Sequence, residues 1–332
     1  MSEPPKVALV GCGYWGKNLC RNFHSLGSLH HVVDSTETGQ AMAKELAPKA
    51  TVTSSIDDVL ENPEIQAVAL ATPAETHAKL AIRAMQAGKD VFVEKPMALT
   101  LEDAERMKAV ADQTKSILMV GHLLEYHPAV LKLRELIDSC ELGKINYVYS
   151  NRLNFGKVRT EENALWSFAP HDVAVILRLI GQSPIEVSAT GGSYLTKGLA
   201  DVTVSNMRFF DETRAHVFVS WLHPFKEQRL VVVGDKKMAI FNDVATFGEK
   251  LLLYPQTVEF EGKIPVLKKE DFEPVEYSDA EPLREECRHF LNCVTNRNKP
   301  LTDAQSGIEV LKVLHACQSS IDQNGIPIAL SK

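Results

Sequence analysis

The stretch KVALVGCGYWG, residues 6–16, decides the fold of this chain. Four apolar residues, 7–10, predict a buried strand, and three glycines follow it in G-x-G-x-x-G spacing. In this motif the first glycine permits a tight turn, the second lets the backbone approach a pyrophosphate, and the third lets helix and strand pack closely. Backbone N–H groups at the start of the next helix then stabilise phosphate charge. The stretch predicts a dinucleotide-binding loop made of Gly11, Gly13, Tyr14, Trp15 and Gly16.

The next predicted strand, HHVVD at residues 30–34, ends in Asp34. An acid at this point can accept hydrogen bonds from an adenosine ribose diol, and it repels a 2′-phosphate. No arginine closely follows Asp34 to bind such a phosphate, so the pattern predicts NAD rather than NADP as the cofactor. The alternative is a glycine turn next to an aspartate that only caps the following helix.

The first 121 residues alternate strands with helices. Amphipathic stretches predict the helices, and apolar runs predict strands at residues 6–11, 30–34, 51–55, 66–72, 90–94 and 116–121. Crossovers of this length predict a parallel, doubly wound sheet of the Rossmann type. We therefore expect an NAD-binding α/β domain over residues 1–121.

After Gly121 the pattern changes. Runs that alternate apolar and polar residues, joined by short turns, predict a large, mostly antiparallel open sheet, and one of the helical stretches covers residues 171–181. We expect an α+β domain over residues 122–332 that binds substrate and mediates oligomerisation. Because such a sheet leaves a face that two chains can bury against each other, we expect a homodimer or homotetramer.

Composition limits the partners. The chain has 332 residues and a formal net charge of −7, without the basic excess that nucleic acids or anionic membranes attract. Its start lacks the layout of a signal peptide, and no apolar run approaches the length of a membrane span. The six cysteines are scattered without a C-x-x-C pair, which indicates reduced core residues rather than disulfides or zinc ligands. We expect a cytoplasmic protein that acts on a small molecule, with no metal.

The fourth predicted strand ends in ATPAETH, residues 71–77. In an open α/β sheet the ligand lies in the crevice beyond the carboxyl ends of the strands, so we expect Thr72 and Pro73 to lie along the cofactor. His77 follows at the start of the next helix. It contacts either the cofactor or only the backbone there, and the sequence leaves both interpretations open.

The fifth predicted strand runs into Glu94, Lys95 and Pro96. Lys95 stands at the carboxyl end of this strand, beside the expected nicotinamide site, and Pro96 favours extended dihedrals for it. A partly desolvated amine at such a site has a lowered pKa and can take the proton of an alcohol while hydride passes to the cofactor. The alternative for Lys95 is a charged residue before a surface turn.

In chain order, G-x-G-x-x-G, Asp34, ATPxxxH and EKP resemble the Gfo/Idh/MocA family of sugar-handling oxidoreductases. VGHLLEYHPAV (120–130) and EPLREECRHFLNCV (281–294) extend the resemblance over nearly the whole chain. The resemblance implies a dehydrogenase of CH–OH groups, with Glu94 and Lys95 on the cofactor side, Lys95 catalytic, and a cis peptide bond before Pro96. It also implies that His171 faces the cofactor and shares the proton relay or orients the substrate hydroxyl. The alternative is a capping histidine at a helix start.

The chain departs from the family at two positions. Many members have an aspartate four residues before the histidine, where this chain has Ser167, and Glu125 replaces an arginine that is often found in the family. Two interpretations follow for the first departure. Either Asp172 substitutes as the charge partner of His171, or the dyad is absent.

Cationic and amide groups gather upstream of His171, in NRLNFGKVRTEENALW at residues 151–166. They suit an anionic sugar, and Trp166 and Trp221 can stack on its ring; a solvated loop and core aromatics are the alternative. The expected substrate-binding residues are Arg152, Asn154, Lys157, Trp166, His171 and Asp172. This segment resembles the surface-polysaccharide branch of the family, whose enzymes oxidise C3 of UDP-N-acetylglucosaminuronate. Inositol or free-sugar dehydrogenation is the nearest rival, and a non-catalytic dinucleotide-binding sensor or repressor is a rival of another class.

Overall fold

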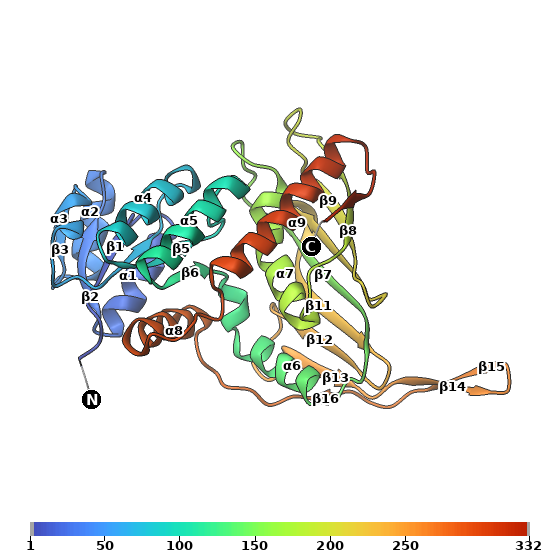
Figure 1. The fold of residues 1–332 in the computed structure, drawn as a ribbon. Coiled ribbons are helices and arrows are strands. Elements are labelled where there is room, and N and C mark those ends of the chain that lie inside the picture. The colour runs from blue at the N-terminus through green and yellow to red at the C-terminus, as the bar shows by residue number, and fades with distance from the viewer. Residues whose placement is uncertain (1–2, 331–332) are drawn as a thin grey trace. The chain divides into compact units, whose positions relative to one another are not determined.

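The computed structural model describes residues 3–330 and divides into two compact units (Figure 1). The first unit contains the chain up to Tyr126 together with Ala280–Leu311, and the second contains His127–Asp279 and the chain from Lys312 on. This division differs from the expected boundary between residues 121 and 122. It begins the second unit slightly later, and it assigns a segment from the last sixth of the chain to the first unit.

A six-stranded parallel sheet forms the centre of the first unit. Its strands are β1 (Val7–Val10), β2 (Leu29–Val33), β3 (Thr51–Thr53), β4 (Ala67–Leu70), β5 (Asp90–Glu94) and β6 (Leu118–Gly121). Their order is β3-β2-β1-β4-β5-β6, and every neighbouring pair is parallel. The predicted doubly wound sheet is confirmed. Its strand order reverses between β1 and β4, and folds of this kind bind ligands at that switch point.

The helices of this sheet begin where their local sequences favour a start. They are α1 (Gly16–Ser25), α2 (Glu37–Leu46), α3 (Asp57–Leu60), α4 (Ala74–Gln86) and α5 (Leu101–Thr114). The hydroxyls of Thr36 and Thr100 accept hydrogen bonds from the N–H groups of Gly39 and Asp103, so each satisfies a donor that the helix leaves unpaired. A short 3₁₀ helix, η1 (Leu123–Tyr126), closes the unit's first segment.

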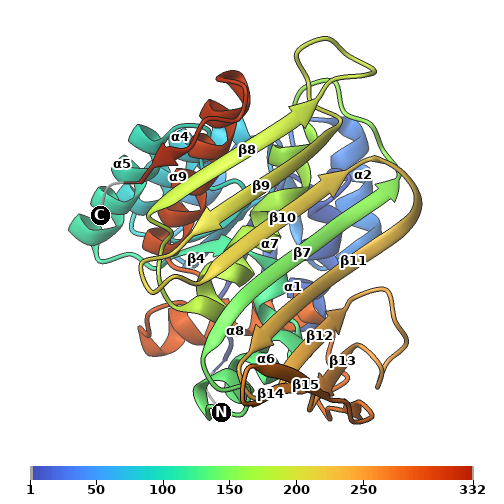
Figure 2. The ribbon, with the colours of Figure 1, turned by 90° about the vertical axis from the view of Figure 1, so that its right-hand side faces the viewer.

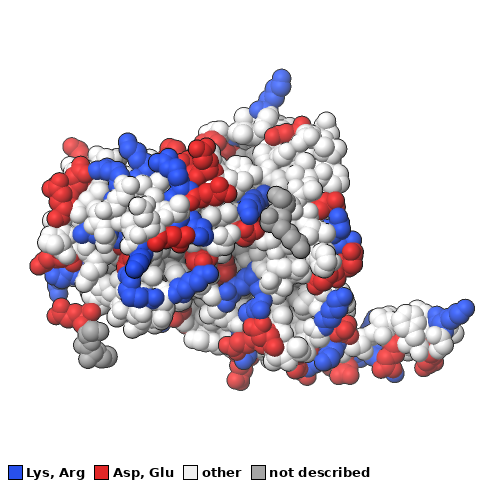
Figure 3. Space-filling view, in the orientation of Figure 1, with Lys and Arg blue, Asp and Glu red and all other residues white. Residues whose placement is uncertain are grey.

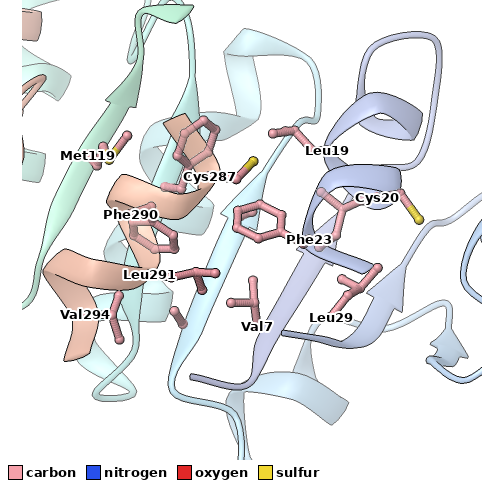
Figure 4. Close-up of a cluster of buried hydrophobic side chains, with 14 of the residues drawn as sticks. Val7, Leu19, Cys20, Phe23, Leu29, Met119, Cys287, Phe290, Leu291 and Val294 are labelled. Carbon is pink, nitrogen blue, oxygen red and sulfur yellow. The ribbon is translucent and has the colours of Figure 1, made fainter. Parts of the chain in front are cut away.

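Helix α8 (Pro282–Asn296) belongs to the first unit although it lies far along the sequence. Its Phe290 packs edge-on against Phe23 of α1 and Phe92 of β5, with ring centroids 6.3 Å and 5.8 Å apart, inside one buried apolar cluster. Figure 4 shows Phe290 and Phe23 in this cluster. Burial of apolar surface stabilises by about 25 cal/mol per Å², so three packed aromatic rings hold the helix on this sheet. The sequence pattern predicts an amphipathic helix here, but it does not say which sheet the helix covers.

A nine-stranded sheet forms the second unit. In sheet order its strands are β16 (Glu273–Pro274), β13 (Leu251–Tyr254), β12 (Met238–Asn242), β11 (Leu222–Gly234), β7 (Ile145–Phe155), β10 (Arg214–Ser220), β9 (Val202–Arg208), β8 (Glu186–Gly192) and β17 (Ile328–Ala329). All neighbours are antiparallel except β7 and β10, so the predicted mostly antiparallel sheet is confirmed. A separate hairpin joins β14 (Thr257–Glu261) to β15 (Ile264–Lys268).

One face of this sheet is covered and the other is open. Helix α7 (Ala164–Ile180) packs against β7, β9 and β10 on the covered face, and α6 (Pro128–Asp138) packs against β12. Helix α9 (Ala304–Asp322) ends in this unit. Figure 2 looks onto the open face, where the described residues place no helix of this unit. The expected open sheet is therefore present.

Helix α7 begins at Ala164, not at His171 as the sequence predicts. Asn163 caps it, because its side-chain oxygen accepts from the N–H of Trp166 at 3.2 Å. Pro170 lies inside the helix. Proline usually marks a helix boundary since it lacks a donor and clashes with the preceding turn, but here packing on the sheet overrides that preference. His171 lies within the helix, so it is not the capping histidine of the alternative interpretation.

The charges that can be seen are mixed. On the face of Figure 3, lysines and arginines are interspersed with acidic residues. That face therefore offers no continuous basic surface of the kind that binds a nucleic-acid backbone. None of the helices within residues 3–330 is long and apolar enough to cross a membrane.

Candidate active site

Glycines shape the loop between β1 and α1. Gly11 has a φ of +91°, and its N–H donates to the carbonyl of Val33 at 2.8 Å. A Cβ on Gly16 would lie 2.0 Å from the carbonyl oxygen of Gly11, so only glycine fits there. A Cβ on Gly13 would meet no described atom within 4 Å, which leaves the backbone open to a ligand. This loop, residues 11–16, has the shape to hold a pyrophosphate at the N-terminus of α1, and we call it the phosphate loop.

Asp34 is held in place beside this loop. Its Oδ2 accepts from the N–H of Cys12 at 2.7 Å, and its Oδ1 accepts from the N–H and the hydroxyl of Thr36 at 2.8 and 2.7 Å. Burial works to raise the pKa of Asp34, but these hydrogen bonds together hold that pKa below its ordinary value. Asp34 is a fixed anion whose remaining lone pairs can accept from a ribose diol.

Thr72 and Pro73 follow β4 on the side of the switch point, and His77 contacts the backbone near them. The two ring nitrogens of His77 lie 2.9 Å from the carbonyl oxygens of Thr72 and Pro96. His77 is buried, and a neutral imidazole donates through only one nitrogen. Its ring therefore lies between the segment after β4 and the segment after β5 and donates a hydrogen bond to one of the two carbonyls. Of the two interpretations of His77, the contact to the backbone is the one that this geometry supports.

Trp15, Glu94 and Lys95 lie together at the carboxyl end of β5. The indole N–H of Trp15 donates to Oε1 of Glu94 at 2.5 Å, and the backbone N–H of Lys95 donates to Oε2 at 3.3 Å. Glu94 is buried, Lys95 is half-buried, and the peptide bond between Lys95 and Pro96 is cis. One carboxylate thus contacts both the phosphate loop and the main chain of the candidate catalytic lysine.

A further buried acid, Glu286, lies near Glu94 and Glu125. The sequence analysis named Glu125 only as a departure from the family and missed Glu286. Burial, together with the negative charges of Glu94 and Glu125, raises the pKa of Glu286 well above its ordinary value. Burial also raises the pKa of Glu94 to about 7, against the lowering effects of Trp15 and Lys95. One signal could have found Glu286, because it occupies the buried apolar face of α8. An acid in an apolar stripe indicates a buried polar cluster.

His171 and Ser167 are one turn apart on α7 and share a helix face, whereas Asp172 points in another direction. Asp172 is buried and accepts from the hydroxyl of Ser150 at 2.6 Å. It also accepts from Nε of Arg152 at 2.6 Å. Both side-chain contacts of Asp172 are thus with residues of β7. On the helix face of His171, one turn before it, the position where many family members have an aspartate is occupied by Ser167.

Arg152 is buried by the same contact. Its side chain is only 14% exposed and its guanidinium contacts both carboxylate oxygens of Asp172. Burial works to lower the pKa of Arg152, but the charge and hydrogen bonds of Asp172 raise it above its ordinary value. Arg152 and Asp172 form a bidentate pair that fastens α7 to β7. The expectation that they contact the substrate stays a prediction.

The two tryptophans considered for ring stacking are used inside the second unit. Nε1 of Trp166 donates to Oε1 of Gln318 at 3.2 Å, and its ring packs edge-on against His315 with centroids 4.9 Å apart. Trp221 is fully buried, and its Nε1 donates to Oδ1 of Asp201 at 2.6 Å. Trp221 therefore cannot stack on a sugar, and the core alternative is correct for it.

Asn154 and Lys157 lie on the segment that leads from β7 into α7. Asn154 belongs to the end of β7, and Lys157 is exposed just beyond it. Both precede His171 on the helix that follows. The expected cofactor-side residues thus belong to the first unit, and the expected substrate-side residues belong to the second.

Comparison with known families covers most of the chain. Residues 5–122 match a model described as an oxidoreductase family with an NAD-binding Rossmann fold. Residues 130–240 match the C-terminal domain of Gfo/Idh/MocA proteins. The observed division between Tyr126 and His127 lies in the short stretch between the two matched segments.

Several relatives match over large parts of their length. The chain is 29% identical over 260 residues to the 2,7-anhydro-N-acetylneuraminate hydratase of Mediterraneibacter gnavus, with 74% of this chain and 68% of the relative covered. It is 27% identical to the UDP-N-acetylglucosamine 3-dehydrogenase of Acidithiobacillus ferrooxidans, with 92% and 94% covered. It is 26% identical to the scyllo-inositol 2-dehydrogenase of Bacillus subtilis, with 99% and 97% covered.

A solved structure has the same architecture over almost its full length. The Acidithiobacillus ferrooxidans UDP-N-acetylglucosamine 3-dehydrogenase superposes with a TM-score of 0.84 at 25% identity, and the match covers 96% of this chain and 97% of that one. The likeness therefore includes the sheet of the second unit as well as the Rossmann sheet. The chain belongs to the Gfo/Idh/MocA family of oxidoreductases, and its first domain is the NAD-binding Rossmann domain of that family.

Proposed function

We propose that this protein is an NAD-dependent dehydrogenase that transfers hydride between a secondary hydroxyl of a sugar and nicotinamide, with Lys95 as the acid–base group. The observation that carries the proposal is the setting of Lys95. Lys95 follows β5 directly and is half-buried. Its neighbour Glu94 is buried and accepts a hydrogen bond from Trp15 of the phosphate loop. The carboxyl ends of the central strands in such a sheet border the ligand crevice.

Bound NAD supplies the hydride acceptor for this chemistry. Neutral Lys95 takes the hydroxyl proton as the C–H bond breaks, and the resulting ammonium returns a proton in the reverse direction. The carboxylate of Glu94 stabilises that ammonium. His122 stays neutral near it, because burial and the positive charge of Lys95 lower the pKa of His122 to about 3. Lys95 is then the titrating base, with no imidazolium from His122 to repel its proton.

We assign His171 to orienting the substrate hydroxyl. It lies inside α7, so its backbone is fixed by helix hydrogen bonds and its imidazole can donate to or accept from a hydroxyl. Ser167 stands one turn earlier, where many family members have a carboxylate. His171 therefore works in a less negative setting than the family pattern provides, which favours an orienting role over that of a strong base.

For the substrate we propose a nucleotide sugar, such as a UDP-N-acetylhexosaminuronate oxidised at C3. Support comes from the relative named UDP-N-acetylglucosamine 3-dehydrogenase, which matches along almost the whole chain. The exposed Lys157 before α7 also suits a carboxylate or diphosphate. Inositol dehydrogenation is the second candidate, since the scyllo-inositol relative matches over 99% of the chain. The two candidates differ in the charge of the substrate.

Absorbance of the reduced cofactor tests the proposal. The protein is mixed with NAD and, in turn, with UDP-N-acetylglucosaminuronate, UDP-N-acetylglucosamine, scyllo-inositol and N-acetylglucosamine. We expect the highest kcat/KM with a nucleotide sugar, and Lys95→Met is the matched control that binds NAD but forms little NADH. Fastest turnover of inositol would select the second candidate. Calorimetric binding of NAD without turnover of any sugar would contradict a dehydrogenase and favour a dinucleotide-binding sensor.

A further inference from the structure

The phosphate loop and the end of β5 are joined by a hydrogen bond between side chains 79 residues apart, Trp15 and Glu94. Trp15 is one of the two bulky residues between Gly13 and Gly16, and its side chain is partly exposed while its N–H reaches a buried carboxylate. The other oxygen of Glu94 faces the backbone N–H of Lys95. A ligand-binding loop therefore donates directly to the acid that adjoins the candidate catalytic lysine.

The pKa of the Glu94 carboxyl group is set by opposing effects. Only 7% of it is exposed, and a Cβ on Gly121 would lie 3.1 Å from its Oε2, so little water can reach it. Burial favours its neutral form, whereas the Trp15 indole and the Lys95 charge favour its ionised form, and the balance raises the pKa of Glu94 to about 7. Among the described residues, the titratable groups that interact with Glu94 include Glu286 and Cys287 of α8. Glu125 of η1 acts on Glu286, and His122 is affected by the charge of Lys95.

We propose that Trp15 is a positioning residue for the hydride transfer proposed above: its indole N–H holds the carboxyl group of Glu94 next to Lys95 and favours its ionised form. The inference rests on the proposed function, because Lys95 is the acid–base group only if that function holds. Of the effects that lower the pKa of Glu94, the hydrogen bond from Trp15 is the largest. Loss of the indole therefore removes the side-chain hydrogen bond that offsets the burial of this carboxylate.

The direction of the effect follows from charge. Without the indole, Glu94 binds its proton up to a higher pH, so Lys95 loses an adjacent negative charge over the neutral range. A lysine without that charge gives up its proton more easily. Since oxidation needs the neutral amine, the rising limb of the rate profile moves to lower pH. Glu94→Gln removes the charge altogether and moves the limb in the same direction by about one to three pH units.

Three variants test this: Trp15→Phe, Glu94→Gln and the double variant. The first measurement uses the resting protein without cofactor. Infrared titration follows the carboxyl band of protonated Glu94, which is assigned as the band that Glu94→Gln lacks. We expect this band to persist to a pH about one unit higher in Trp15→Phe. The second measurement is the pH profile of kcat, in which the double variant should have the same limb as Glu94→Gln, because Trp15 acts through Glu94.

Trp221→Phe is the matched control. It removes an indole N–H from another buried carboxylate, Asp201, in the second unit. It therefore reproduces the cost of losing such a bond without touching Glu94, and we expect its carboxyl titration and its pH limb to match the wild type. A shift in this control equal to that of Trp15→Phe would mean that general destabilisation causes the effect, which overturns the inference.

Two further results would also overturn it. One is a Glu94 band that titrates at the same pH in Trp15→Phe and in the wild type. The other is a pair of limb shifts, from Trp15→Phe and Glu94→Gln, that add in the double variant. Failure of the proposed function is seen elsewhere, in wild-type protein that turns over no sugar. The infrared result decides the contact between Trp15 and Glu94 in either case.

Discussion

Arg152 of β7 and Asp172 of α7 form a bidentate ion pair inside the second unit, with N–O distances of 2.6 and 3.2 Å. Only 14% of the Arg152 side chain and 2% of the Asp172 side chain are exposed. Two charges this deeply buried depend on each other, because neither can be solvated if its partner is removed. The pair therefore holds α7, and with it His171, on the sheet.

Asp172→Ala should lower the free energy of unfolding by about 3–5 kcal/mol, since it leaves the Arg152 guanidinium buried without its counter-charge. Urea denaturation followed by circular dichroism measures the loss. Replacing both residues, with Arg152→Met and Asp172→Leu, should recover most of it. If Asp172→Ala leaves stability unchanged but raises KM strongly, the pair binds substrate rather than supporting the fold.

Lys95→Met should lower kcat by about 10²–10⁴-fold, the range that general acid–base catalysis contributes. The affinity for NAD should stay close to that of the wild type, because the phosphate loop and Asp34 are untouched. Steady-state kinetics and calorimetry on the same preparation check both statements. If this variant turned over substrate as fast as the wild type, Lys95 would not be the acid–base group. The alternative interpretation, a charged residue before a surface turn, would then hold.

Asp34→Ser should narrow the preference for NAD over NADP. Wild-type Asp34 accepts from a ribose diol and repels a 2′-phosphate, and serine keeps only a weak hydrogen bond. We expect the Kd of NADP divided by the Kd of NAD to fall by about tenfold or more, which corresponds to about 1.4 kcal/mol. Calorimetric titration of both cofactors measures it. A wild type that binds NADP more tightly than NAD would contradict the assignment of Asp34.

The free energy of unfolding should decrease as the pH falls below neutral, in part because of His122. Burial lowers its pKa in the folded protein to about 3, below the ordinary value of 6.5. As the pH falls below about 6.5 the unfolded chain takes up a proton that the folded chain refuses, so stability declines until the pH reaches the folded pKa. Thermal unfolding at several pH values between about 7 and 4 should show a smaller decline in Tm for His122→Gln. Parallel curves for the two proteins would rule out His122 as a cause.

The chain should form a homo-oligomer through the open face of the nine-stranded sheet. Phe218 and Val204 are cross-strand neighbours on that face, and Val204 is 36% exposed. Phe218→Glu would place a charge in the interface and should produce monomers, as measured by light scattering at micromolar concentration. Lys49→Glu, an exposed change in the first unit, is the control. A wild type that is monomeric at that concentration would contradict the prediction.

The sequence alone determined the elements whose geometry is written into neighbouring residues. The run 6–16 specifies a strand, a turn that only glycine permits at Gly11, and a helix start, and Asp34 follows at the end of the next strand. Such features depend on local sterics and hydrogen bonding within a few residues, so the Rossmann sheet and the cofactor side of the site could be predicted. The strand periodicity of the second domain likewise predicted its open sheet.

Only the tertiary structure decided which distant groups meet. Helix α8 packs on the Rossmann sheet, Trp15 bonds to Glu94, and Arg152 pairs with Asp172. A buried polar group must find a partner, but the sequence does not name that partner, because many acids and donors of the same type are available along the chain. The start of α7 was missed for a related reason: Pro170 opposes a helix locally, and packing on the sheet outweighs that preference.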